Sequence, residues 1–381
     1  MNARLHPNHA ARRPKGTIGR HLPRSGRGQT GGVRALTVLP GTAGSAAVTD
    51  IDDPPLADGP VLVETLAVGV CGTDLEICKG EYGTAPAGSE RLVIGHESIG
   101  RVLEAPDGAG LAAGDLVVGI VRRPDPTPCP FCAIGEWDMC RTGTYTERGI
   151  KDRHGYASER YRIDPAFTVR VDPGLGDVGV LLEPTTVVAK AWDHIERIGR
   201  RSPAWSPQRV LVCGAGPIGL LAALLGVQRG HEVHVADRVT DGPKPALVAR
   251  LGATYHAETI DALAGMADVV LECTGVPQVV VAVLANTAPD AIVCLTGVSS
   301  GGRTLSFDAG EVNREMVLGN AVVFGSVNAN RRHYEAGADA LRQADPAWLA
   351  ALITRRVPLE SFAEALERRP DDVKTVITFG R

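Results

Sequence analysis

The pattern of apolar and polar positions divides the chain into two regions with different periods. Between about residues 33 and 170, apolar runs such as 61–63 and 116–118 are short and are separated by turns rich in glycine, proline and aspartate. Short strands separated in this way are typical of an antiparallel, barrel-like domain. From residue 209 onward, strand-like runs alternate with helix-like segments, which predicts a parallel, doubly wound sheet.

Individual elements of the second region follow from this alternation. Strands are expected at 210–213, 233–236, 268–272, 291–295 and 321–327, and helices at 220–228, 244–251 and 278–286. A helix at 181–198 precedes them, followed by a polar linker at 202–208. The tail has a helix-like stretch at 361–368 and a strand-like end at 374–379, and we assign it back to the first region.

One stretch of the second region carries a nucleotide-binding pattern. An apolar strand leads into Gly214-Ala215-Gly216-Pro217-Ile218-Gly219, an apolar helix follows, and the next strand ends at Asp237. The first glycine permits a tight turn, the second lets the backbone approach a pyrophosphate, and the third lets helix and strand pack closely. Free N–H groups at the helix N-terminus favour the pyrophosphate. Asp237 is placed to accept a hydrogen bond from a ribose hydroxyl.

We therefore predict an α/β protein with two domains. A catalytic β-barrel domain is expected at 33–187, with 328–381 returning to it, and a Rossmann doubly wound domain at 188–327. Ligands of such sheets bind at the carboxyl ends of the strands. The pairs Cys273-Thr274 and Thr296-Gly297 follow two expected strands and are further candidates for cofactor binding.

Composition and charge narrow the classes of function. The chain is 44% hydrophobic but only 4% aromatic, which argues against a base-stacking nucleic-acid binder. Residues 1–32 hold seven Lys or Arg and no acid, and the remainder holds 33 basic and 44 acidic side chains. An acidic body does not favour nucleic-acid or membrane partners, and no apolar run is long enough for a membrane span.

The first 32 residues and the cysteines bear on the compartment. Residues 1–32 lack the apolar core of a secretory signal and are expected to form a disordered basic extension. Eight cysteines in a chain without such a signal favour free thiols or metal ligands over disulfides. We therefore expect a cytoplasmic protein.

Three separated segments contain side chains that bind zinc in proteins. They are GVCGTD with Cys71, GHE with His96 and Glu97, and LLEP with Glu183. A catalytic zinc site keeps three protein ligands and one open position. Together with the nucleotide-binding pattern, these segments resemble the zinc-dependent medium-chain dehydrogenase/reductase superfamily, whose members are similar to alcohol dehydrogenases.

The resemblance extends from about Val33 to the C-terminus and implies a GroES-like fold for the barrel domain. It implies a catalytic zinc held by Cys71, His96 and Glu183, with Glu97 as an alternating ligand or a supporting residue. It also implies hydride transfer from a hydroxyl-bearing carbon to NAD or NADP. Thr73 then passes the hydroxyl proton towards the cofactor ribose. The superfamily is dimeric or tetrameric, so we expect a homodimer or a homotetramer.

A second group of cysteines lies in CPFCAIGEWDMC, which contains Cys129, Cys132 and Cys140. A CxxC pair with a third cysteine suggests a structural zinc. These residues match the last three of four cysteines in the superfamily's structural-zinc lobe, and Pro126 stands at the first position. A closed site needs four ligands. Two alternatives stay open: Asp125 supplies the fourth ligand, or the lobe holds no metal.

Further segments resemble the glucose 1-dehydrogenases of this superfamily, among them 71–83, 143–150 and 325–328. In that branch Glu147 matches a residue that binds sugar hydroxyls, and Asn328 matches one near both the nicotinamide and the sugar. The resemblance implies oxidation of an aldose at C1 to its lactone. The substrate contacts that it implies are Thr73, Glu97, Glu147, Glu183 and Asn328.

The choice of cofactor and two other functions stay open. Asp237 favours NAD by repelling a 2′-phosphate, whereas Arg238 can pair with that phosphate. A polyol, threonine or an amino-cyclitol is an alternative substrate within the same superfamily. A non-catalytic NAD(P)-binding protein is an alternative from another class, and the intact Cys71, Thr73 and His96, with Glu97 and Glu183, argue against it.

Overall fold

The structure of the protein is a computed structural model that describes residues 32–257, 260–299, 301 and 304–380. The expected basic extension at 1–32 lies outside the described residues, apart from Gly32. Among the helices of the described part, none combines the length and the apolar character that a crossing of a membrane requires.

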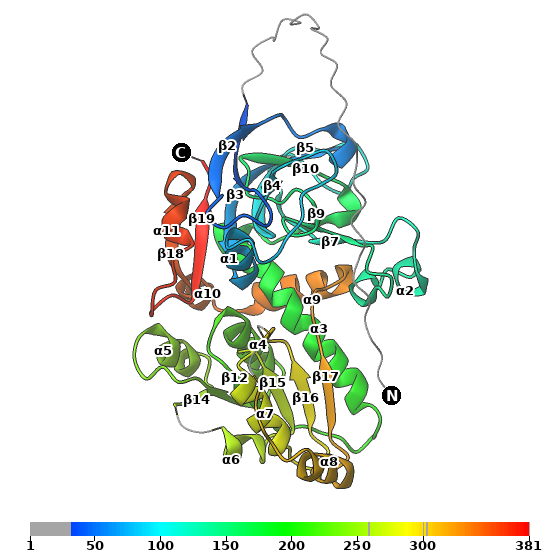
Figure 1. Ribbon diagram of the computed structural model, residues 1–381, viewed down its shortest axis with the longest axis vertical. Helices are drawn as coiled ribbons and strands as arrows, with labels where there is room; N and C mark the ends of the chain where they lie inside the picture. The colour runs from blue at the N-terminus through cyan, green and yellow to red at the C-terminus, as the bar shows by residue number, and fades with distance from the viewer. Residues whose placement is uncertain (1–31, 258–259, 300, 302–303, 381) are drawn as a thin grey trace, which may run out of the picture. The chain divides into compact units, whose positions relative to one another are not determined.

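The longest strand of the first region organises the sheet around it. In β3 (Val61–Val70) apolar positions alternate with less buried ones, and the strand pairs on both sides. The sheet has the order β11-β6-β5-β3-β19-β18, and β10 also pairs with β3. The other strands are β5 (Glu97–Glu104), β6 (Leu116–Gly119), β10 (Arg160–Ile163), β11 (Thr168–Arg170), β18 (Ile353–Pro358) and β19 (Lys374–Thr378). Strands from the C-terminal tail thus lie beside β3 (Figure 1).

Two small sheets and a loop lobe complete this region. One sheet contains β1 (Val33–Val38), β2 (Ala47–Ile51) and β4 (Leu92–Val93), and the other contains β7 (Arg122–Arg123), β8 (Thr146–Arg148) and β9 (Asp152–Arg153). The short helix α1 (Gly72–Cys78) follows β3 directly. The lobe between β7 and β8 contains α2 (Pro130–Ala133) and a 3₁₀ turn at Trp137–Met139. It stands out from the sheets in Figure 1.

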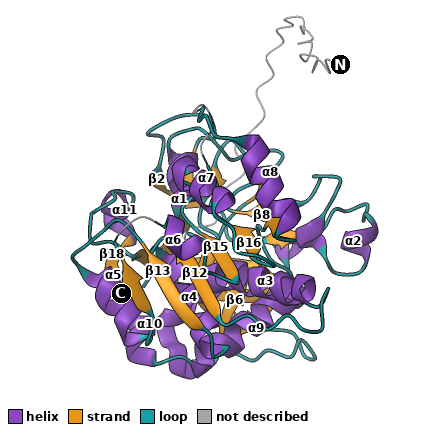
Figure 2. Cartoon of the chain, turned by 90° about the horizontal axis from the view of Figure 1, so that it is seen from below, coloured by secondary structure: helices purple, strands orange, loops and turns teal. Residues whose placement is uncertain are grey.

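The second region is a six-stranded sheet with the order β14-β13-β12-β15-β16-β17, and every pair in it is parallel. Its strands are β12 (Arg209–Cys213), β13 (Glu232–Ala236), β14 (Thr254–His256), β15 (Val269–Glu272), β16 (Ile292–Leu295) and β17 (Val322–Gly325). The chain changes direction across the sheet between β12 and β15, where ligands of such sheets bind. Figure 2 shows helices on both faces of these strands.

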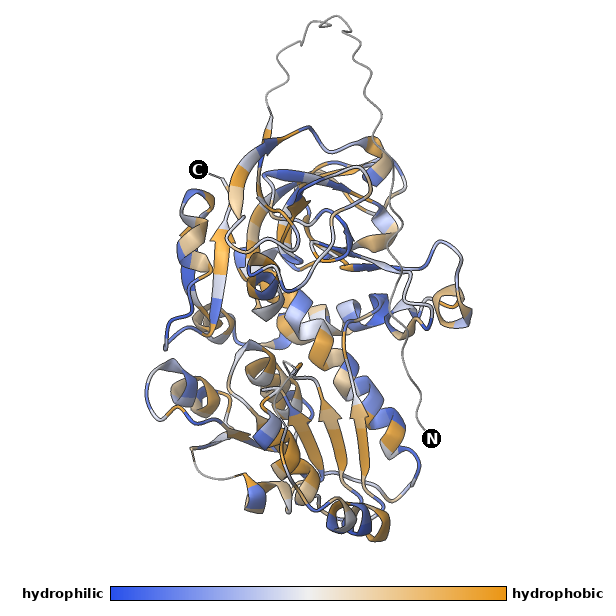
Figure 3. Ribbon diagram, in the orientation of Figure 1, coloured by the Kyte–Doolittle hydropathy of each residue, from blue (hydrophilic) through white to orange (hydrophobic). Residues whose placement is uncertain are grey.

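Burial on both faces explains the continuous apolar runs of the central strands. All four residues of β15 are buried, and so are four of the five in β12. These strands and α4 (Pro217–Gln228) are mainly hydrophobic, as Figure 3 shows for the strands of this sheet. Parallel strands covered by helices on both sides have no polar face, so their sequence does not alternate.

The long helix α3 (Leu182–Gly199) connects the two regions and packs against α4 and α9 (Arg331–Gln343). It was expected at 181–198. Helix α9 was not expected, because its sequence is mainly polar and only a narrow face, including Tyr334 and Leu341, is buried. Two further helices were also missed, α8 (Ala309–Leu318) and α10 (Pro346–Leu352). The helix expected at 361–368 is shorter: α11 covers only Phe362–Ala365, so it begins after a 3₁₀ turn at Leu359–Ser361 and ends three residues before the expected end.

Candidate active site

Two of the three expected zinc-binding segments meet where β3 and β5 pair. Cys71 follows the end of β3, and His96 and Glu97 lie at the start of β5, with Gly69 opposite Glu97 in the ladder. The Cys71 Sγ atom lies 3.1 Å from His96 Nε2. One potential ligand atom from each of Cys71, His96 and Glu97 lies within 4.8 Å of the others. The antiparallel pairing therefore brings a thiol, an imidazole and a carboxylate together.

Asp74 supports this group from the first turn of α1. Its Oδ2 accepts a hydrogen bond from the Cys71 backbone N–H at 3.0 Å, and its Oδ1 lies 3.5 Å from His96 Nδ1. Burial alone would raise the pKa of Asp74, but the His96 ring lowers it, so the carboxylate stays charged. Holding Nδ1 in this way directs Nε2 towards Cys71, as expected for a metal-binding histidine. The sequence contained this signal, because Asp74 ends GVCGTD, but no role was assigned to it.

Lys374 is a second supporting residue, and the sequence offered no signal for it. It comes from β19 near the C-terminus and forms a buried ion pair with Glu97. Its Nζ also donates to the Val70 carbonyl oxygen at 3.2 Å. A Cβ on Gly69 would collide with both the Glu97 carboxylate and the Lys374 side chain. The glycine of GVCG thus leaves the space in which this ion pair forms.

Glu183, the third expected ligand, lies in the first turn of α3 and is buried. Burial, together with the nearby Glu97, raises the pKa of Glu183 to about 7, while His96 and Lys374 act in the opposite direction. Glu183 is therefore within electrostatic reach of the group. It is not among the residues whose ligand atoms lie within 4.8 Å of one another. Sulfur, imidazole and carboxylate donors suit zinc, and the three that lie within 4.8 Å of one another are those of Cys71, His96 and Glu97, with Glu183 in electrostatic reach.

The three glycines of the nucleotide-binding pattern have three different environments. Gly214 has a φ of +100°, which a residue with a side chain rarely adopts. A Cβ on Gly219 would collide with the Gly214 carbonyl oxygen, so the helix packs closely on the turn. A Cβ on Gly216 would meet no protein atom within 4 Å. Pro217 and Ile218 begin α4, whose N-cap is Gly216. The turn thus leaves space beside Gly216 for a phosphate.

Asp237 follows β13 and closes the glycine turn. Its Oδ2 accepts hydrogen bonds from the Ala215 backbone N–H at 2.7 Å and from Lys244 Nζ at 3.2 Å. Burial would raise the pKa of Asp237, but the Ala215 N–H and the Lys244 charge lower it. Lys244 lies in α5 (Pro243–Arg250) and was not singled out in the sequence. The neighbouring Arg238 is exposed and makes no ion pair with any residue the structure describes.

The two other expected cofactor segments meet at the carboxyl edge of the sheet. Glu272, buried at the end of β15, accepts hydrogen bonds from the Thr274 and Gly275 N–H groups. Thr296 Oγ1 donates to the Glu272 carbonyl oxygen at 2.9 Å. A Cβ on Gly297 would collide with the Gly275 backbone. Hydrogen bonds to Glu272 therefore hold the pairs Cys273-Thr274 and Thr296-Gly297 next to each other. The sequence analysis did not identify this role of Glu272.

The residues expected to bind a sugar form a second buried contact. Asn328 Nδ2 donates to Glu147 Oε1 at 2.8 Å, and Arg122 Nε donates to the same oxygen at 3.0 Å. Asn328 has a φ of +62°, in the left-handed region that asparagine tolerates better than most residues. Thr73 lies in α1 and makes no side-chain hydrogen bond within the described part of the chain. No direct contact joins Glu147 or Asn328 to Cys71 or His96 among the described residues.

The cysteine lobe brings Cys129, Cys132 and Cys140 together, again within 4.8 Å. Asp125, the alternative fourth ligand, already accepts hydrogen bonds from the Thr127 N–H at 2.9 Å, from Thr142 Oγ1 at 2.6 Å and from Thr144 Oγ1. Backbone N–H groups, first that of Arg141, lower the pKa of Cys129 to about 7. Within the described ranges, no carboxylate or imidazole joins the three sulfurs as a fourth member of the group.

A further group of possible metal ligands, Asp193, His194 and His333, lies between α3 and α9. Its members already have partners. His333 Nδ1 accepts from the Asn330 N–H, its Nε2 lies 3.3 Å from Asp193 Oδ2, and Arg332 pairs with the same carboxylate. Burial lowers the pKa of His333 to about 4, so its ring is neutral. We read this group as an interhelical contact.

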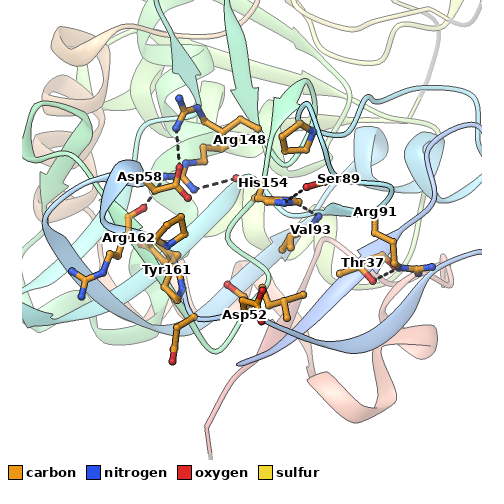
Figure 4. A pocket seen from close by; sticks show the side chains of 18 of the residues that line it. Thr37, Asp52, Asp58, Ser89, Arg91, Val93, Arg148, His154, Tyr161 and Arg162 are labelled. Atoms are coloured by element: carbon orange, nitrogen blue, oxygen red, sulfur yellow. Dashed lines mark hydrogen bonds and ion pairs between the residues drawn. The ribbon is translucent and has the colours of Figure 1, made fainter. Parts of the chain in front are cut away.

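A cavity of about 930 Å³ lies on the barrel domain, away from the candidate zinc ligands. Figure 4 shows His154, Arg148, Asp58 and Arg162 at its wall. Some of its charged and polar groups pair with one another: Arg153 pairs with Asp58, Arg160 with Asp53, and His154 Nδ1 accepts from the Val93 N–H. Neither the zinc-binding group nor the glycine turn lines this cavity, so we do not assign the reaction to it.

Comparison with known proteins covers both regions of the chain. Residues 57–173 match the family model of the alcohol dehydrogenase GroES-like domain, and residues 176–379 match that of the glucose dehydrogenase C-terminus. Glucose 1-dehydrogenase 2 of Vulcanisaeta moutnovskia is 41% identical over 350 residues, covering 91% of this chain and 99% of the relative. The chain belongs to the glucose dehydrogenase family of zinc-dependent medium-chain dehydrogenases.

Other members of the family agree with this assignment. Glucose 1-dehydrogenase of Methanocella arvoryzae is 41% identical over 359 residues, covering 91% of this chain and 100% of the relative. Haloferax mediterranei glucose dehydrogenase, solved with NADP, zinc and gluconolactone, is 32% identical and superimposes with a TM-score of 0.84 over 91% of this chain and 99% of that chain. The expected fold class, a GroES-like β-barrel domain with a Rossmann domain, is confirmed.

Proposed function

We propose that this protein is a zinc-dependent glucose 1-dehydrogenase that transfers a hydride from C1 of an aldose to NADP or NAD and releases the lactone. The observation that carries the proposal is the group of half-buried Cys71 with buried His96 and Glu97, in a chain whose other domain presents a glycine turn for a dinucleotide. It is supported by relatives named glucose 1-dehydrogenase and by the Haloferax mediterranei structure with NADP, zinc and gluconolactone.

The residues of this chain divide the work of binding and proton movement. Cys71, His96 and Glu183 would hold the metal, and Asp74 and Lys374 keep His96 and Glu97 in place. A bound zinc ion would supply Lewis acidity that lowers the pKa of the C1 hydroxyl. Thr73 Oγ1, which makes no side-chain hydrogen bond within the described chain, accepts that proton and passes its own towards the cofactor ribose. Proton loss favours departure of the C1 hydrogen as hydride to the nicotinamide.

Sugar binding falls to Glu147 and Asn328 in this proposal. Glu147 is buried, and its described hydrogen bonds all end on Oε1, which leaves Oε2 to accept from a sugar hydroxyl. A site built to pair with hydroxyls rejects analogues that lack them, because its own buried polar groups then stay unpaired. This chemistry favours a polyhydroxylated substrate over a simple alcohol.

NADP is proposed as a cofactor alongside NAD. Lys244 neutralises Asp237, and the adjacent Arg238 faces solvent without an ion-pair partner in the described chain. The local charge is therefore positive rather than negative, so a 2′-phosphate would meet attraction at this point. Asp237, which by itself favours NAD, is thus neutralised by Lys244, which the fold places beside it.

A homodimer or homotetramer in the cytoplasm is also part of the proposal. Strand β17 is the outer strand of its sheet, and Val317 and Leu318 on the adjoining α8 are strongly exposed. Unpaired strand edges with apolar neighbours favour association with a second copy. All eight cysteines are free thiols, which fits a reducing compartment.

A substrate and cofactor panel tests the proposed function. The purified protein, with its zinc content measured, is assayed with aldoses, polyols, threonine and amino-cyclitols, with either cofactor. We expect the highest kcat/KM with glucose-type aldoses and formation of the lactone. Turnover of polyols or threonine without any aldose oxidation would replace the aldose assignment. Cofactor binding without turnover or zinc would favour the non-catalytic alternative.

A further inference from the structure

A closed ring of buried hydrogen bonds joins the cysteine lobe to the residues proposed to hold the sugar. Arg122 Nε and Asn328 Nδ2 both donate to Glu147 Oε1, at 3.0 and 2.8 Å. Two residues beyond Asn328, Asn330 Nδ2 donates to Asp138 Oδ1 at 2.7 Å. Arg122 Nη1 donates to the Asp138 carbonyl oxygen at 3.3 Å and closes the ring. Asp138 therefore contacts both Arg122, which binds Glu147, and Asn330, which lies two residues after Asn328.

Lys190 makes a further connection between the two sides of this ring. Its Nζ lies 2.9 Å from Asp138 Oδ2 and donates to the Val327 carbonyl oxygen at 3.0 Å. Lys190 is 2% exposed and Asp138 is 6% exposed. A buried charge that loses its partner is strongly unfavourable, so each of these groups depends on the other. The segment from Val327 to Asn330 is thus held by three residues that lie outside it, namely Lys190, Glu147 and Asp138.

The three residues that hold this segment come from three different elements. Asp138 belongs to the 3₁₀ turn between Cys132 and Cys140, Glu147 belongs to β8, and Lys190 belongs to α3. Asn328 lies between β17 and α9 with its left-handed φ of +62°. Such a conformation is unfavourable for a residue with a side chain unless its surroundings hold it. The ring supplies those surroundings.

We propose that Asp138 is a positioning residue for the sugar: it holds Asn328 and Glu147 in their binding geometry through Asn330, Lys190 and Arg122. This inference rests on the proposed function for the identity of the substrate. It gives the cysteine lobe a part in sugar binding that does not depend on whether the lobe contains a metal. Asp138 touches neither the zinc-binding group nor the glycine turn, so it affects neither metal nor cofactor directly.

Substitutions of Asp138 test the inference through separate kinetic constants. In Asp138→Ala the side-chain bonds to Asn330 and Lys190 are lost, and we expect KM for glucose to rise about tenfold, since small misplacements of binding groups have large effects. We expect kcat and the zinc content to stay within about twofold, because Asp138 contacts none of the zinc-binding residues. Asp138→Asn, which keeps an acceptor for Asn330, is expected to have a smaller effect on KM.

Two further variants separate positioning from a general loss of stability. Lys190→Met combined with Asp138→Asn removes both charges, so stability should recover relative to Asp138→Asn while KM for glucose stays raised. The matched control is Thr65→Val on β3. It removes one buried hydrogen bond, from Thr65 Oγ1 to the Tyr156 carbonyl oxygen, away from the ring. It should lower the melting temperature without changing KM. An unchanged KM in Asp138→Ala, or an equal rise in Thr65→Val, would overturn the inference.

Hydrogen exchange distinguishes a failure of this inference from a failure of the proposed function. If the wild-type protein oxidises no aldose, the proposed function fails, but the ring can still be examined. Amide exchange in residues 326–330 should be about tenfold faster in Asp138→Ala, because Asn330 loses its bond to Asp138 and Lys190, which ties Val327, loses its ion-pair partner. Exchange in residues 146–148, which are tied to this segment through the Glu147–Asn328 bond, should rise with it. Exchange at wild-type rates in both segments would show that Asp138 does not hold them.

Discussion

Two groups of three potential metal ligands lie in the same domain and differ in how the fold supports them. Cys71, His96 and Glu97 come from two paired strands, and Glu183 is within electrostatic reach. Cys129, Cys132 and Cys140 come from one 12-residue stretch.

Support from other parts of the chain is the main difference between the two groups. Asp74 and Lys374 hold the first group, whereas Asp125, the alternative fourth ligand of the lobe, accepts hydrogen bonds from two threonines. Residues around the ligands tune metal affinity almost as much as the ligands themselves. Spacing in the sequence therefore marks both groups, but only the first has the surroundings of a catalytic site.

Removal of the metal should show the largest difference between the two groups. We expect treatment with a strong chelator to abolish glucose oxidation and added zinc to restore it, because the metal stabilises the developing alkoxide by several kcal/mol. Zinc content measured beside activity should show that the first zinc bound per chain restores full activity. Full activity in zinc-free protein would contradict the catalytic assignment, and a second tightly held zinc would show that the lobe also binds metal.

Replacement of one cysteine in each group compares them directly. Cys71→Ser is expected to lower kcat/KM for glucose by about 10³-fold, because several kcal/mol of transition-state stabilisation is lost. The matched variant Cys132→Ser is expected to lower it less than tenfold. Steady-state kinetics on folded protein checks both. Equal losses in the two variants would remove the distinction drawn between the groups.

Replacement of the supporting residues gives a smaller effect. Lys374→Met leaves Glu97 buried without its ion-pair partner, and we expect zinc affinity to fall about 10–100-fold. Asp125→Asn in the lobe is the matched variant and should leave the affinity of the catalytic zinc unchanged. Competition with a chromophoric chelator measures both. If Lys374→Met binds zinc as tightly as the wild type, Lys374 does not support the site.

The same kind of lysine–carboxylate pair can be tested in the cofactor region, where the smallest effect is expected. Lys244→Met removes the charge that neutralises Asp237. The ratio of kcat/KM with NADP to kcat/KM with NAD should then fall about tenfold, because one charged contact contributes about 1 kcal/mol or more. The ratio of kcat/KM with the two cofactors measures this. Arg238→Gln should shift the ratio in the same direction. An unchanged ratio in both variants would place the discrimination elsewhere.

Features that depend on residues close together in the sequence were predictable from it. The strand–turn–helix order, the α/β class with a GroES-like and a Rossmann domain, and the family were all expected and are confirmed. Helices α8, α9 and α10 were missed. In α9 the buried face is narrow, and most of its residues are polar, so an apolar pattern was too weak to reveal it.

The sequence by itself determined which side chains are available as metal ligands and where a dinucleotide turn forms, because each is marked by residue types within a short segment. Only the tertiary structure decided which charges are compensated. Lys374, Lys244 and Lys190 resemble any surface lysine in the sequence, yet each meets a carboxylate in a buried or partly buried place. Burial makes an unpaired charge costly, and burial and pairing exist only after distant segments have packed together.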